Sequence, residues 1–304
     1  MEILITGGAG FVGSHLAERL LQDGHEVTIV DDLSNGRQRW CPTGAAFVTR
    51  DLTTQSAIDD VITPDIDLVF HLASRKAVND DNPRDQFREN TEMTYELVES
   101  ILEAGVPEFA FTSTSTVYGE APRPTPEDFA PLEPISSYGA SKLACEGILS
   151  TAAHSHELTV YNFRFANIVG PRLRGAVIPD FIEKLRDDPE SMTILGNGLQ
   201  EKSYMHIDDC IDAMLHVCEH ANEPMATYNL GTRTTTSVDR IADIVADEMG
   251  VDPDYEYTGG DRGWTGDVPK MRLSIEKLKS LGWTPSLESD QAVRSSTREL
   301  LDEL

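Results

Sequence analysis

The chain has 304 residues, and 39% of them are hydrophobic, which is enough to bury the core of one large domain or of two modest ones. Its 52 acidic and 25 basic side chains give a net charge of −27, which argues against binding to nucleic acid or to an anionic membrane surface. No apolar run approaches the roughly 18 residues that span a bilayer, and the chain begins with a strand-like segment rather than a signal peptide. We therefore expect a cytoplasmic protein.

The charged residues also indicate the environment in which the protein works. Acidic residues occur along the whole chain, whereas lysines are few. A solvated acidic surface suits a cytoplasm at molar salt, because salt screens the repulsion between carboxylates. We expect a halophilic source, and the alternative is an ordinary acidic protein. The four cysteines are scattered and form no C-x-x-C pair, so neither a metal site nor a disulfide is predicted.

The first turn of the chain is rich in glycine. An apolar β-branched run leads directly into Gly7, Gly10 and Gly13, after which apolar residues recur at helical spacing. This pattern predicts a strand, a tight turn and a helix N-terminus, whose unpaired amides a pyrophosphate can approach. A second strand at 27–30 ends on Asp31, about 20 residues further on, from where an acid binds the ribose 2′-OH. Because the carboxylate repels a 2′-phosphate, the sequence predicts NAD rather than NADP.

The alternation of strands and helices continues after this unit. Strands are predicted at 46–48, 68–70, 109–111 and 158–163, and a helix at 84–104. Such an alternation predicts a parallel sheet that is covered on both faces. Ligands of such sheets bind beyond the carboxyl ends of the strands.

Several residues therefore belong to a cofactor crevice by their position after a strand. Asp51 follows the third strand, and Leu72, Ala73 and Ser74 follow the fourth. Asn90 is a polar residue in the predicted helix, and we expect it to face the same crevice.

The alternation ends near residue 165. Four further helices are predicted: three at 178–187, 237–249 and 274–281, and one after Asp209 with Ile211, Met214, Leu215 and Cys218 on its apolar side. We predict two domains: residues 1–165, with a returning segment near 205–249, form the dinucleotide-binding domain, and residues 166–304 form a smaller α+β domain for the substrate.

A hydroxyl-rich strand end and a Tyr-x-x-x-Lys pattern are candidates for the chemistry. Residues 112–116 read Thr-Ser-Thr-Ser-Thr, at the edge of the sheet where a polar substrate can be bound. Tyr138 and Lys142 open the next helix and lie on one face of it, because they are four residues apart. A tyrosine with a pKa near 10 is a poor base at neutral pH. We expect the lysine ammonium, with a cationic nicotinamide nearby, to lower that pKa.

Taken together, these motifs resemble the extended short-chain dehydrogenase/reductase family in its nucleotide-sugar epimerase branch, over nearly the whole chain. The motifs that carry the resemblance are residues 6–13, 31–34, 71–73, 112–119, 138–142, 164–171 and 262–267. The family implies an α/β fold: a Rossmann-type doubly wound parallel sheet with a smaller C-terminal α+β substrate domain. It also implies a homodimer, joined through a bundle of helices 85–104 and 139–155.

The resemblance also implies roles for individual residues. Tyr138 would be the general base, Lys142 its partner, and Thr114 the hydroxyl that binds the sugar O4. For NAD it implies contacts with Gly7, Gly10, Phe11, Val12, Gly13, Asp31, Asp32, Ser34, Asp51, Leu52, Leu72, Ala73, Ser74, Asn90, Thr112, Tyr138, Lys142 and Phe165. For a UDP-sugar substrate it implies contacts with Thr114, Asn167, Val177, Lys202, Arg262 and Asp267.

Two positions depart from the family pattern. Lys202 stands where relatives often have an arginine that binds the diphosphate, and a lysine lacks the bidentate fork. Met271 lies near the gate of the pocket for an acetamido group, and it is smaller than the tyrosine of relatives, so N-acetylated sugars are candidate substrates as well.

The implied activity is inversion of C4 of a UDP-sugar of the UDP-glucose/UDP-galactose type, through a 4-keto intermediate that requires NAD. Related 4,6-dehydratases place Asp-Glu directly after the catalytic threonine, and related decarboxylases place a glutamate two residues on. Ser115 and Thr116 stand at these positions here and supply no carboxylate. A dehydratase, a decarboxylase and a 4-keto reductase remain as alternatives. An alternative of another class is a non-catalytic NAD-binding regulatory protein.

Overall fold

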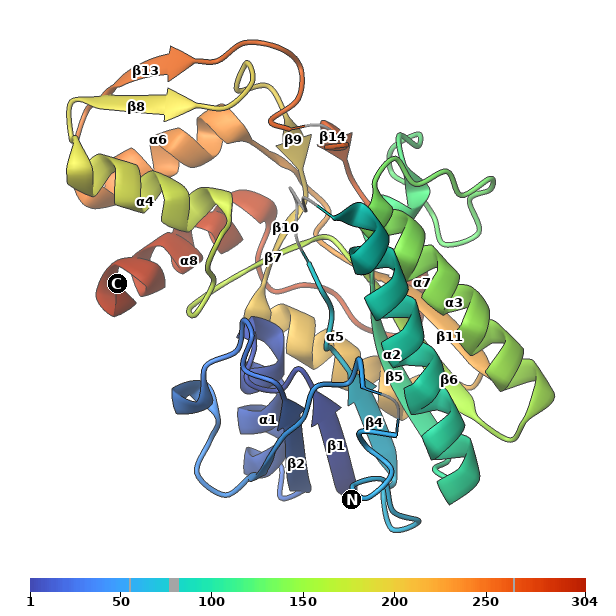
Figure 1. Cartoon of the computed structure of the whole chain (residues 1–304). Coiled ribbons are helices and arrows are strands. Elements are labelled where there is room, and N and C mark those ends of the chain that lie inside the picture. Colours follow the sequence, from blue (N-terminus) through green and yellow to red (C-terminus); the bar gives the residue numbers. More distant parts are fainter. Residues whose placement is uncertain (55, 77–81, 265) are drawn as a thin grey trace. The chain divides into compact units, whose positions relative to one another are not determined.

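The computed structural model describes residues 1–54, 56–76, 82–264 and 266–304 (Figure 1). The chain divides into two compact units, each of which is built from more than one segment. Unit 1 comprises Met1–Val117, Ser136–Arg164 and Met214–Tyr228. Unit 2 comprises Tyr118–Ile135, Phe165–Ala213 and Asn229–Leu304.

Unit 1 is built around a seven-stranded sheet with the strand order β11-β6-β5-β4-β1-β2-β3. The strands are β1 (Glu2–Thr6), β2 (Glu26–Asp31), β3 (Ala46–Thr49), β4 (Leu68–His71), β5 (Glu108–Thr114), β6 (Thr159–Phe165) and β11 (Met225–Leu230). The pairs that β1 forms with β2 and β4 are parallel, with Ile3 opposite Val27 and Leu68. From β3 to β6 the order is that of doubly wound dinucleotide-binding folds. The predicted fold class is therefore confirmed.

The helices of unit 1 begin and end where the sequence provides caps. They are α1 (Phe11–Gln22), α2 (Pro83–Ala104) and α3 (Ser137–Ser155), with 3₁₀ turns at Gln38–Trp40 and Ser115–Tyr118. Asn82 caps α2 by accepting a hydrogen bond from the Asp85 amide, and Gly105 ends the helix with a φ of 76°. The Ser136 side chain caps α3. Helices α2 and α3 pack side by side (Figure 1).

The core of unit 1 lies between the sheet and helices α2 and α3. Leu4 and Phe109 from the strands are fully buried there, together with Leu97 from α2 and Leu149 from α3. Burial of each such side chain stabilises the fold by about 1.5–3 kcal/mol relative to the exposed state. The sheet edge that carries the functional residues is therefore a rigid platform.

Unit 2 contains much shorter strands. They are β7 (Asn167–Val169), β8 (Ser191–Ile194), β9 (Glu201–Lys202), β10 (Tyr204–His206), β12 (Thr236–Ser237), β13 (Asp254–Tyr257) and β14 (Lys270–Met271). They form the small sheets β10-β7, β12-β9-β14 and β13-β8. The helices are α4 (Val177–Asp187), α6 (Val238–Met249), α7 (Glu276–Ser280) and α8 (Ser289–Glu303), and α5 (Ile207–His220) runs from unit 2 into unit 1.

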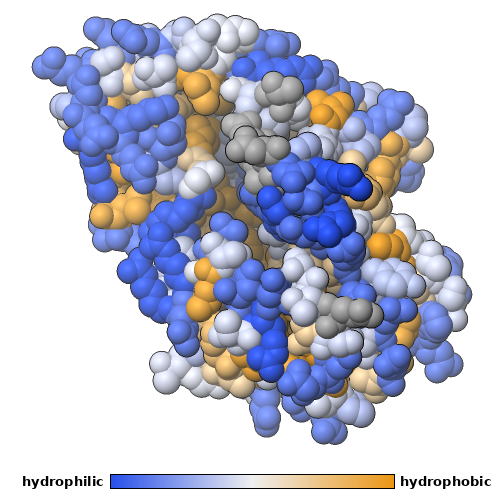
Figure 2. Space-filling model, viewed as in Figure 1, coloured by the Kyte–Doolittle hydropathy of each residue, from blue (hydrophilic) through white to orange (hydrophobic). Residues whose placement is uncertain are grey.

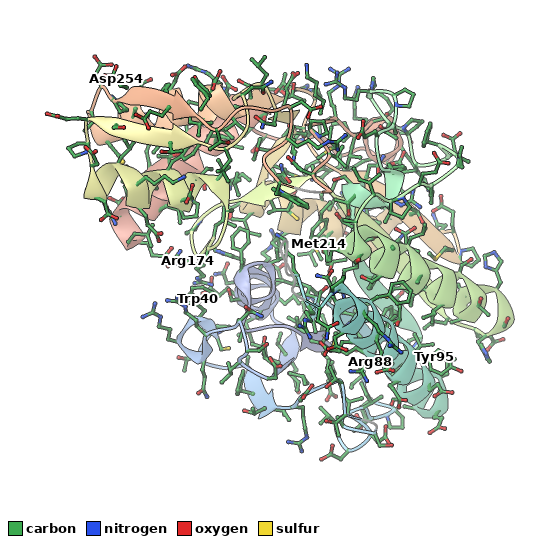
Figure 3. All side chains as sticks on the ribbon, turned by 45° about the horizontal axis from the view of Figure 1, so that its top comes forward. Trp40, Arg88, Tyr95, Arg174, Met214 and Asp254 are labelled. Atoms are coloured by element: carbon green, nitrogen blue, oxygen red, sulfur yellow. The ribbon has the colours of Figure 1, made fainter. Side chains whose placement is uncertain are left out.

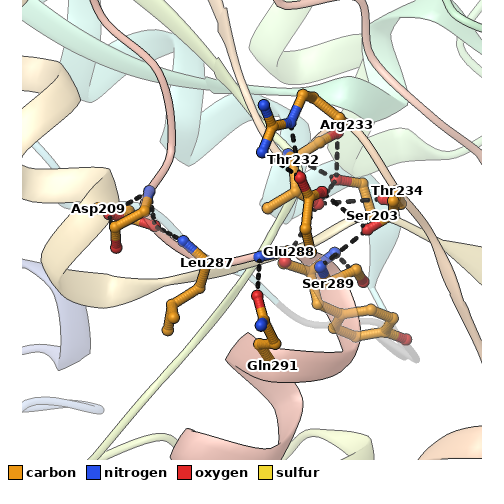
Figure 4. Close-up of polar contacts among 11 residues, drawn as sticks. Ser203, Asp209, Thr232, Arg233, Thr234, Leu287, Glu288, Ser289 and Gln291 are labelled. Carbon is orange, nitrogen blue, oxygen red and sulfur yellow. Dashed lines mark hydrogen bonds and ion pairs between the residues drawn. The ribbon is translucent and has the colours of Figure 1, made fainter.

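Helix α8 is absent from our prediction, and the structure shows why. Its buried face includes Ser289, Ser296 and Thr297, so the apolar stripe in the sequence is weak. The N-terminus is instead fixed by polar contacts (Figure 4): Glu288 and the Gln291 side chain form a capping box. The Ser289 amide also donates to the Thr234 hydroxyl, and the Ser289 hydroxyl shares a hydrogen bond with Thr236. Both partners are far away in the sequence, so no local pattern predicts these contacts.

The face of the molecule in Figure 2 is mainly hydrophilic, with hydrophobic residues scattered in small groups. This agrees with the excess of charged residues in the sequence. Among the described residues, no helix has both the length and the apolar character that a membrane crossing requires.

Candidate active site

The glycine turn after β1 is shaped for a close approach of other atoms. Gly7 has a φ of 70°, and a Cβ there would lie 2.6 Å from the Ala73 amide nitrogen. A Cβ on Gly13 would lie 2.4 Å from the Gly7 carbonyl oxygen. Helix α1 starts after Gly10 without a side-chain cap, so its first amides, at Phe11 and Val12, face the turn unblocked. These groups fit the pyrophosphate of a dinucleotide.

Asp31 lies at the carboxyl end of β2. Its carboxylate accepts hydrogen bonds from the amides of Ala9, at 3.0 Å, and Leu33, at 2.8 Å. Burial raises the pKa of Asp31 above its ordinary value, and these two hydrogen bonds oppose the rise. The next acid, Asp32, accepts from the amide and the hydroxyl of Ser34. The end of β2 therefore has the ordered carboxylates that a ribose diol requires.

Three more predicted residues lie near the carboxyl ends of strands: Asp51, Leu52 and Thr112. Their side chains already make contacts within the chain. The Asp51 carboxylate accepts from the amide and hydroxyl of Thr53. Leu52 is packed in the core of unit 1, and the Thr112 hydroxyl donates to the His71 carbonyl over 3.3 Å. These residues shape the edge of the site more than they offer free polar groups to it.

Asn90 organises the segment that follows β4. Its side-chain oxygen accepts from the Arg75 amide at 2.8 Å and from the Ser74 hydroxyl at 3.4 Å. Its side-chain nitrogen donates to the Ser141 hydroxyl at 3.0 Å. The structure thus joins α2, the β4 loop and α3 at the residue that the sequence placed in the crevice.

Lys142 is the most deeply buried cation at this site, with 2% of its surface exposed. Its ammonium lies 4.6 Å from the centre of the Phe111 ring, a cation–π contact. Burial lowers the pKa of Lys142 to about 8, although Cys145 and Glu146 counteract that effect. A buried cation four residues along α3 from Tyr138 is the arrangement expected of a tyrosine–lysine pair.

We predicted a lowered pKa for Tyr138, and this prediction is wrong for the chain without a bound cofactor. Burial raises the pKa of Tyr138 to about 12, and the hydrogen bond with Ser74 opposes the rise. Removing the phenol from water disfavours the phenolate more strongly than its neighbours in the chain favour it. Ser74 is thereby identified as the hydroxyl that contacts the Tyr138 side chain.

Thr114 ends β5 and is surrounded by hydroxyl groups. Its oxygen accepts from the Thr116 amide at 3.2 Å and lies 3.2 Å from the Thr116 hydroxyl. The carboxylate of Glu146, which is also buried, is held by Arg164 Nη2 at 2.7 Å and by the Ser113 hydroxyl at 2.5 Å. This acid is therefore committed to an ion pair and is a poor proton donor or acceptor.

Unit 2 brings three of the predicted substrate-binding residues together. Lys202 Nζ lies 2.5 Å from the Asp267 carboxylate, and Arg262 Nη1 donates to the Asp267 carbonyl at 2.5 Å. The other end of the Arg262 guanidinium forms an ion pair with Glu120. Two cations and two acids thus share one polar cluster, and the cations are suited to a diphosphate.

The other predicted residues of unit 2 lie on neighbouring elements. Asn167 begins β7, pairs in register with Tyr204 and contacts the phenol of that residue. Val177 begins α4, whose N-terminus has no side-chain cap and is open to an anion. Phe165, predicted to contact NAD, is the last residue of β6. It begins the segment Phe165–Ala213 of unit 2.

Sequence reasoning missed Phe111, Glu146, Arg164 and Glu120. Only Glu146 had a local signal, because it follows Lys142 by four residues on the same helix. The other three reach the site through pairings between distant segments.

Comparison with known proteins gives a consistent result. Residues 3–231 match the model of the NAD dependent epimerase/dehydratase family. The chain is 32% identical over 302 residues to UDP-glucose 4-epimerase of Mycolicibacterium smegmatis, covering 94% of each protein. It is 38% identical to a crystal structure of UDP-galactose 4-epimerase, with a TM-score of 0.91 over 100% of both chains. A UDP-glucose 4-epimerase from Thermotoga maritima with UDP-glucose shares 30% identity and a TM-score of 0.92, covering 100% of this chain and 99% of that one.

The family match covers the glycine turn, Asp31, Thr114, Tyr138 and Lys142, and the similar structures extend over the whole length of the chain. The resemblance inferred from the motifs is confirmed, and the chain belongs to the NAD-dependent epimerase/dehydratase family.

Proposed function

We propose that the protein is an NAD-dependent epimerase that inverts C4 of a UDP-sugar, of the UDP-glucose/UDP-galactose type, through a 4-keto intermediate. The observation that carries this proposal is the chemistry around Thr114. Its neighbours Ser115 and Thr116 offer hydroxyls only, and the buried acid Glu146 is paired with Arg164. Elimination of water at C5 and C6 needs an acid and a base, whereas oxidation and reduction at C4 needs only one proton acceptor.

In this proposal each unit has a separate task. Tyr138 removes the proton from the sugar 4-OH and later returns it, while the Thr114 hydroxyl binds O4. Lys142 holds a positive charge beside the phenol. The glycine turn and Asp31 would hold NAD, which would supply a hydride acceptor for C4 and a positive ring that favours the phenolate. The nucleotide diphosphate is bound by Lys202, Arg262 and Asn167. Asp267 contacts the ribose and Val177 contacts the substrate, so that the 4-keto sugar turns over without being released.

The test is to incubate the purified protein with UDP-glucose, UDP-galactose, UDP-N-acetylglucosamine and UDP-glucuronate, without added NAD. NMR resolves the C4 epimers of each sugar. We expect interconversion of UDP-glucose and UDP-galactose, because a cycle that regenerates NAD keeps the cofactor bound. A 4-keto-6-deoxy product would identify a dehydratase, and release of CO₂ from UDP-glucuronate would identify a decarboxylase. Epimerisation of the N-acetylated sugar alone would assign the site to that substrate and give Met271 a role in specificity.

The Tyr138→Phe variant separates the enzyme from a non-catalytic NAD-binding protein. We expect it to lose turnover while retaining NAD. Tyr95→Phe is a matched control, because Tyr95 projects from α2 and is 50% exposed (Figure 3). If wild-type protein binds NAD but converts no UDP-sugar, the regulatory alternative replaces the enzyme.

We also propose a homodimer joined through α2 and α3. Phe87 and Tyr95 on α2 are 42% and 50% exposed, and large apolar side chains on a helix face favour association. Light scattering after size exclusion measures the mass directly. A monomer of 33.5 kDa would contradict the proposal.

Finally, we propose a halophilic, cytoplasmic protein of carbohydrate metabolism. The net charge of −27 supports the halophilic part, because carboxylates repel one another at low ionic strength. Dialysis from molar to low salt should abolish the folded circular-dichroism signal. A melting temperature that does not change with salt would contradict adaptation to salt.

A further inference from the structure

A pocket of about 480 Å³ lies within unit 2. It is lined by Ala121, Pro122, Arg123, Glu201, Thr235 and Arg272. Pockets of a few hundred Å³ are large enough to hold small organic ligands. Neither the proposed NAD site nor the proposed sugar-nucleotide site uses any of these six residues.

The register of β9 and β14 separates this pocket from the Lys202 cluster. Lys202 pairs with Met271, and Glu201 pairs with Lys270, in a parallel arrangement. Because successive side chains of a strand point to opposite faces, Glu201 and Lys270 lie on the face opposite Lys202. Arg272 follows Met271 directly, so by the same alternation its side chain lies on the face of Glu201. The pocket therefore lies on the face of β9 opposite Lys202.

The charges in the pocket are unequal. Among the described residues that line it, Glu201 is the only acid. Glu201 accepts a hydrogen bond from the Thr235 hydroxyl, and its Oε2 lies 3.6 Å from Arg123 Nη1. The Arg272 guanidinium forms no ion pair with any acid in the described ranges, in a chain with 52 acidic and 25 basic side chains. With Arg123 balanced by Glu201, Arg272 leaves an excess positive charge. An anion is the ligand that this charge favours.

We propose that this pocket binds a phosphate-bearing, hydroxyl-rich small molecule of the size of a hexose phosphate. The planar fork of Arg272 matches two phosphate oxygens. Glu201 retains lone pairs that accept hydrogen bonds from sugar hydroxyls, and Thr235 lies beside it. The volume exceeds what inorganic phosphate fills, which leaves room for the sugar. This inference does not depend on the proposed function of the other cluster.

Isothermal titration calorimetry of the whole protein tests the proposal. D-glucose 6-phosphate, inorganic phosphate and D-glucose are titrated separately at constant ionic strength, with excess UDP present to occupy the Arg262 cluster. We expect the hexose phosphate to bind more tightly than inorganic phosphate, and D-glucose to give no heat of binding. The Arg272→Gln variant should weaken hexose phosphate binding by about tenfold or more.

Two controls make the result specific. Arg240→Gln removes an exposed arginine that pairs with Asp290 outside the pocket, and it should bind the hexose phosphate as wild type does. Ala121→Trp fills the pocket without changing its charge, so it should abolish binding even if Arg272→Gln misfolds. Three outcomes would each overturn the proposal. The wild type does not bind the hexose phosphate, or both pocket variants bind it as well as the wild type does, or binding is lost only in Arg262→Gln.

Discussion

The two units of the chain are stabilised in different ways. In unit 1, long parallel strands and two long capped helices bury an apolar core, and the functional residues follow directly from the ends of these elements. In unit 2, helices α4, α6 and α8 also bury apolar side chains, but the strands have only two to four residues and are joined in addition by buried polar side chains. Ser203 and Thr232 exchange hydrogen bonds, and Asp209 accepts from the amides of Ser286 and Leu287 (Figure 4).

The difference has a consequence for function. A site on a continuous sheet edge is fixed by the core behind it, so a substitution there affects chemistry more than stability. A site assembled from polar contacts depends on hydrogen bonds between side chains. A ligand can replace one partner of such a hydrogen bond. Unit 1 thus holds its candidate site on a continuous sheet edge, and unit 2 holds its candidate site through polar contacts.

The largest effect is expected from Lys142→Met in unit 1. Removing the buried ammonium takes away the cation that lies one helical turn along α3 from Tyr138, and the rate should fall by about 10²–10⁴-fold. Turnover is measured by NMR and NAD content by release on denaturation. Lys184→Met is the control, because Lys184 lies on α4 in unit 2 and pairs with Asp180. An active Lys142→Met variant would remove Lys142 from the proposed chemistry.

The next effect concerns the stability of unit 2. Burial opposes protonation of His206, but hydrogen bonds to Asp208 and Glu299 outweigh it and raise the pKa of His206 to about 9. A raised pKa stabilises the folded state fully below pH 6.5, and the contribution is lost as the pH rises through about 9. His206→Gln should therefore lower the free energy of unfolding by about 1–3 kcal/mol at pH 6 and hardly at all at pH 10.

Denaturant unfolding at both pH values measures this difference. His156→Gln, an exposed substitution in unit 1, should be neutral at each pH. A deficit of equal size at pH 6 and pH 10 would show that His206 contributes through packing and not through charge.

A smaller effect is expected from Arg262→Gln. Loss of the guanidinium should raise KM for the UDP-sugar by about tenfold, because a charge-assisted contact with the diphosphate is removed. NAD content should not change, since the glycine turn is in unit 1. A variant with unchanged KM would exclude Arg262 from the substrate site.

The smallest effect is expected from Glu120→Gln. Glu120 pairs with Arg262 and competes with an anionic substrate for it. Neutralising this acid should lower KM by about two- to threefold. Asp128→Asn changes an exposed acid in the same segment and should leave KM unaltered. A higher KM in Glu120→Gln would mean that Glu120 positions Arg262 and does not compete for it.

Prediction from the sequence succeeded where structure is local. The helix predicted at 84–104 is Pro83–Ala104, because Asn82, Pro83 and Gly105 mark its ends. It failed for Ser289–Glu303, whose buried face is partly polar. It also predicted a lowered pKa for Tyr138 beside Lys142 and a cationic nicotinamide. In the chain without cofactor, burial raises that pKa, and burial cannot be read from the spacing to Lys142.

The sequence by itself determined the glycine turn, the strand–helix alternation and the placement of Tyr138 and Lys142 on one helix face, because each depends on spacings of a few residues. Only the tertiary structure decided that Glu146 is held by Arg164, that Lys202, Arg262 and Asp267 meet, and that a pocket lies beside β9. Those contacts join residues distant in the chain, and the energy that selects them comes from burial and charge in the folded state.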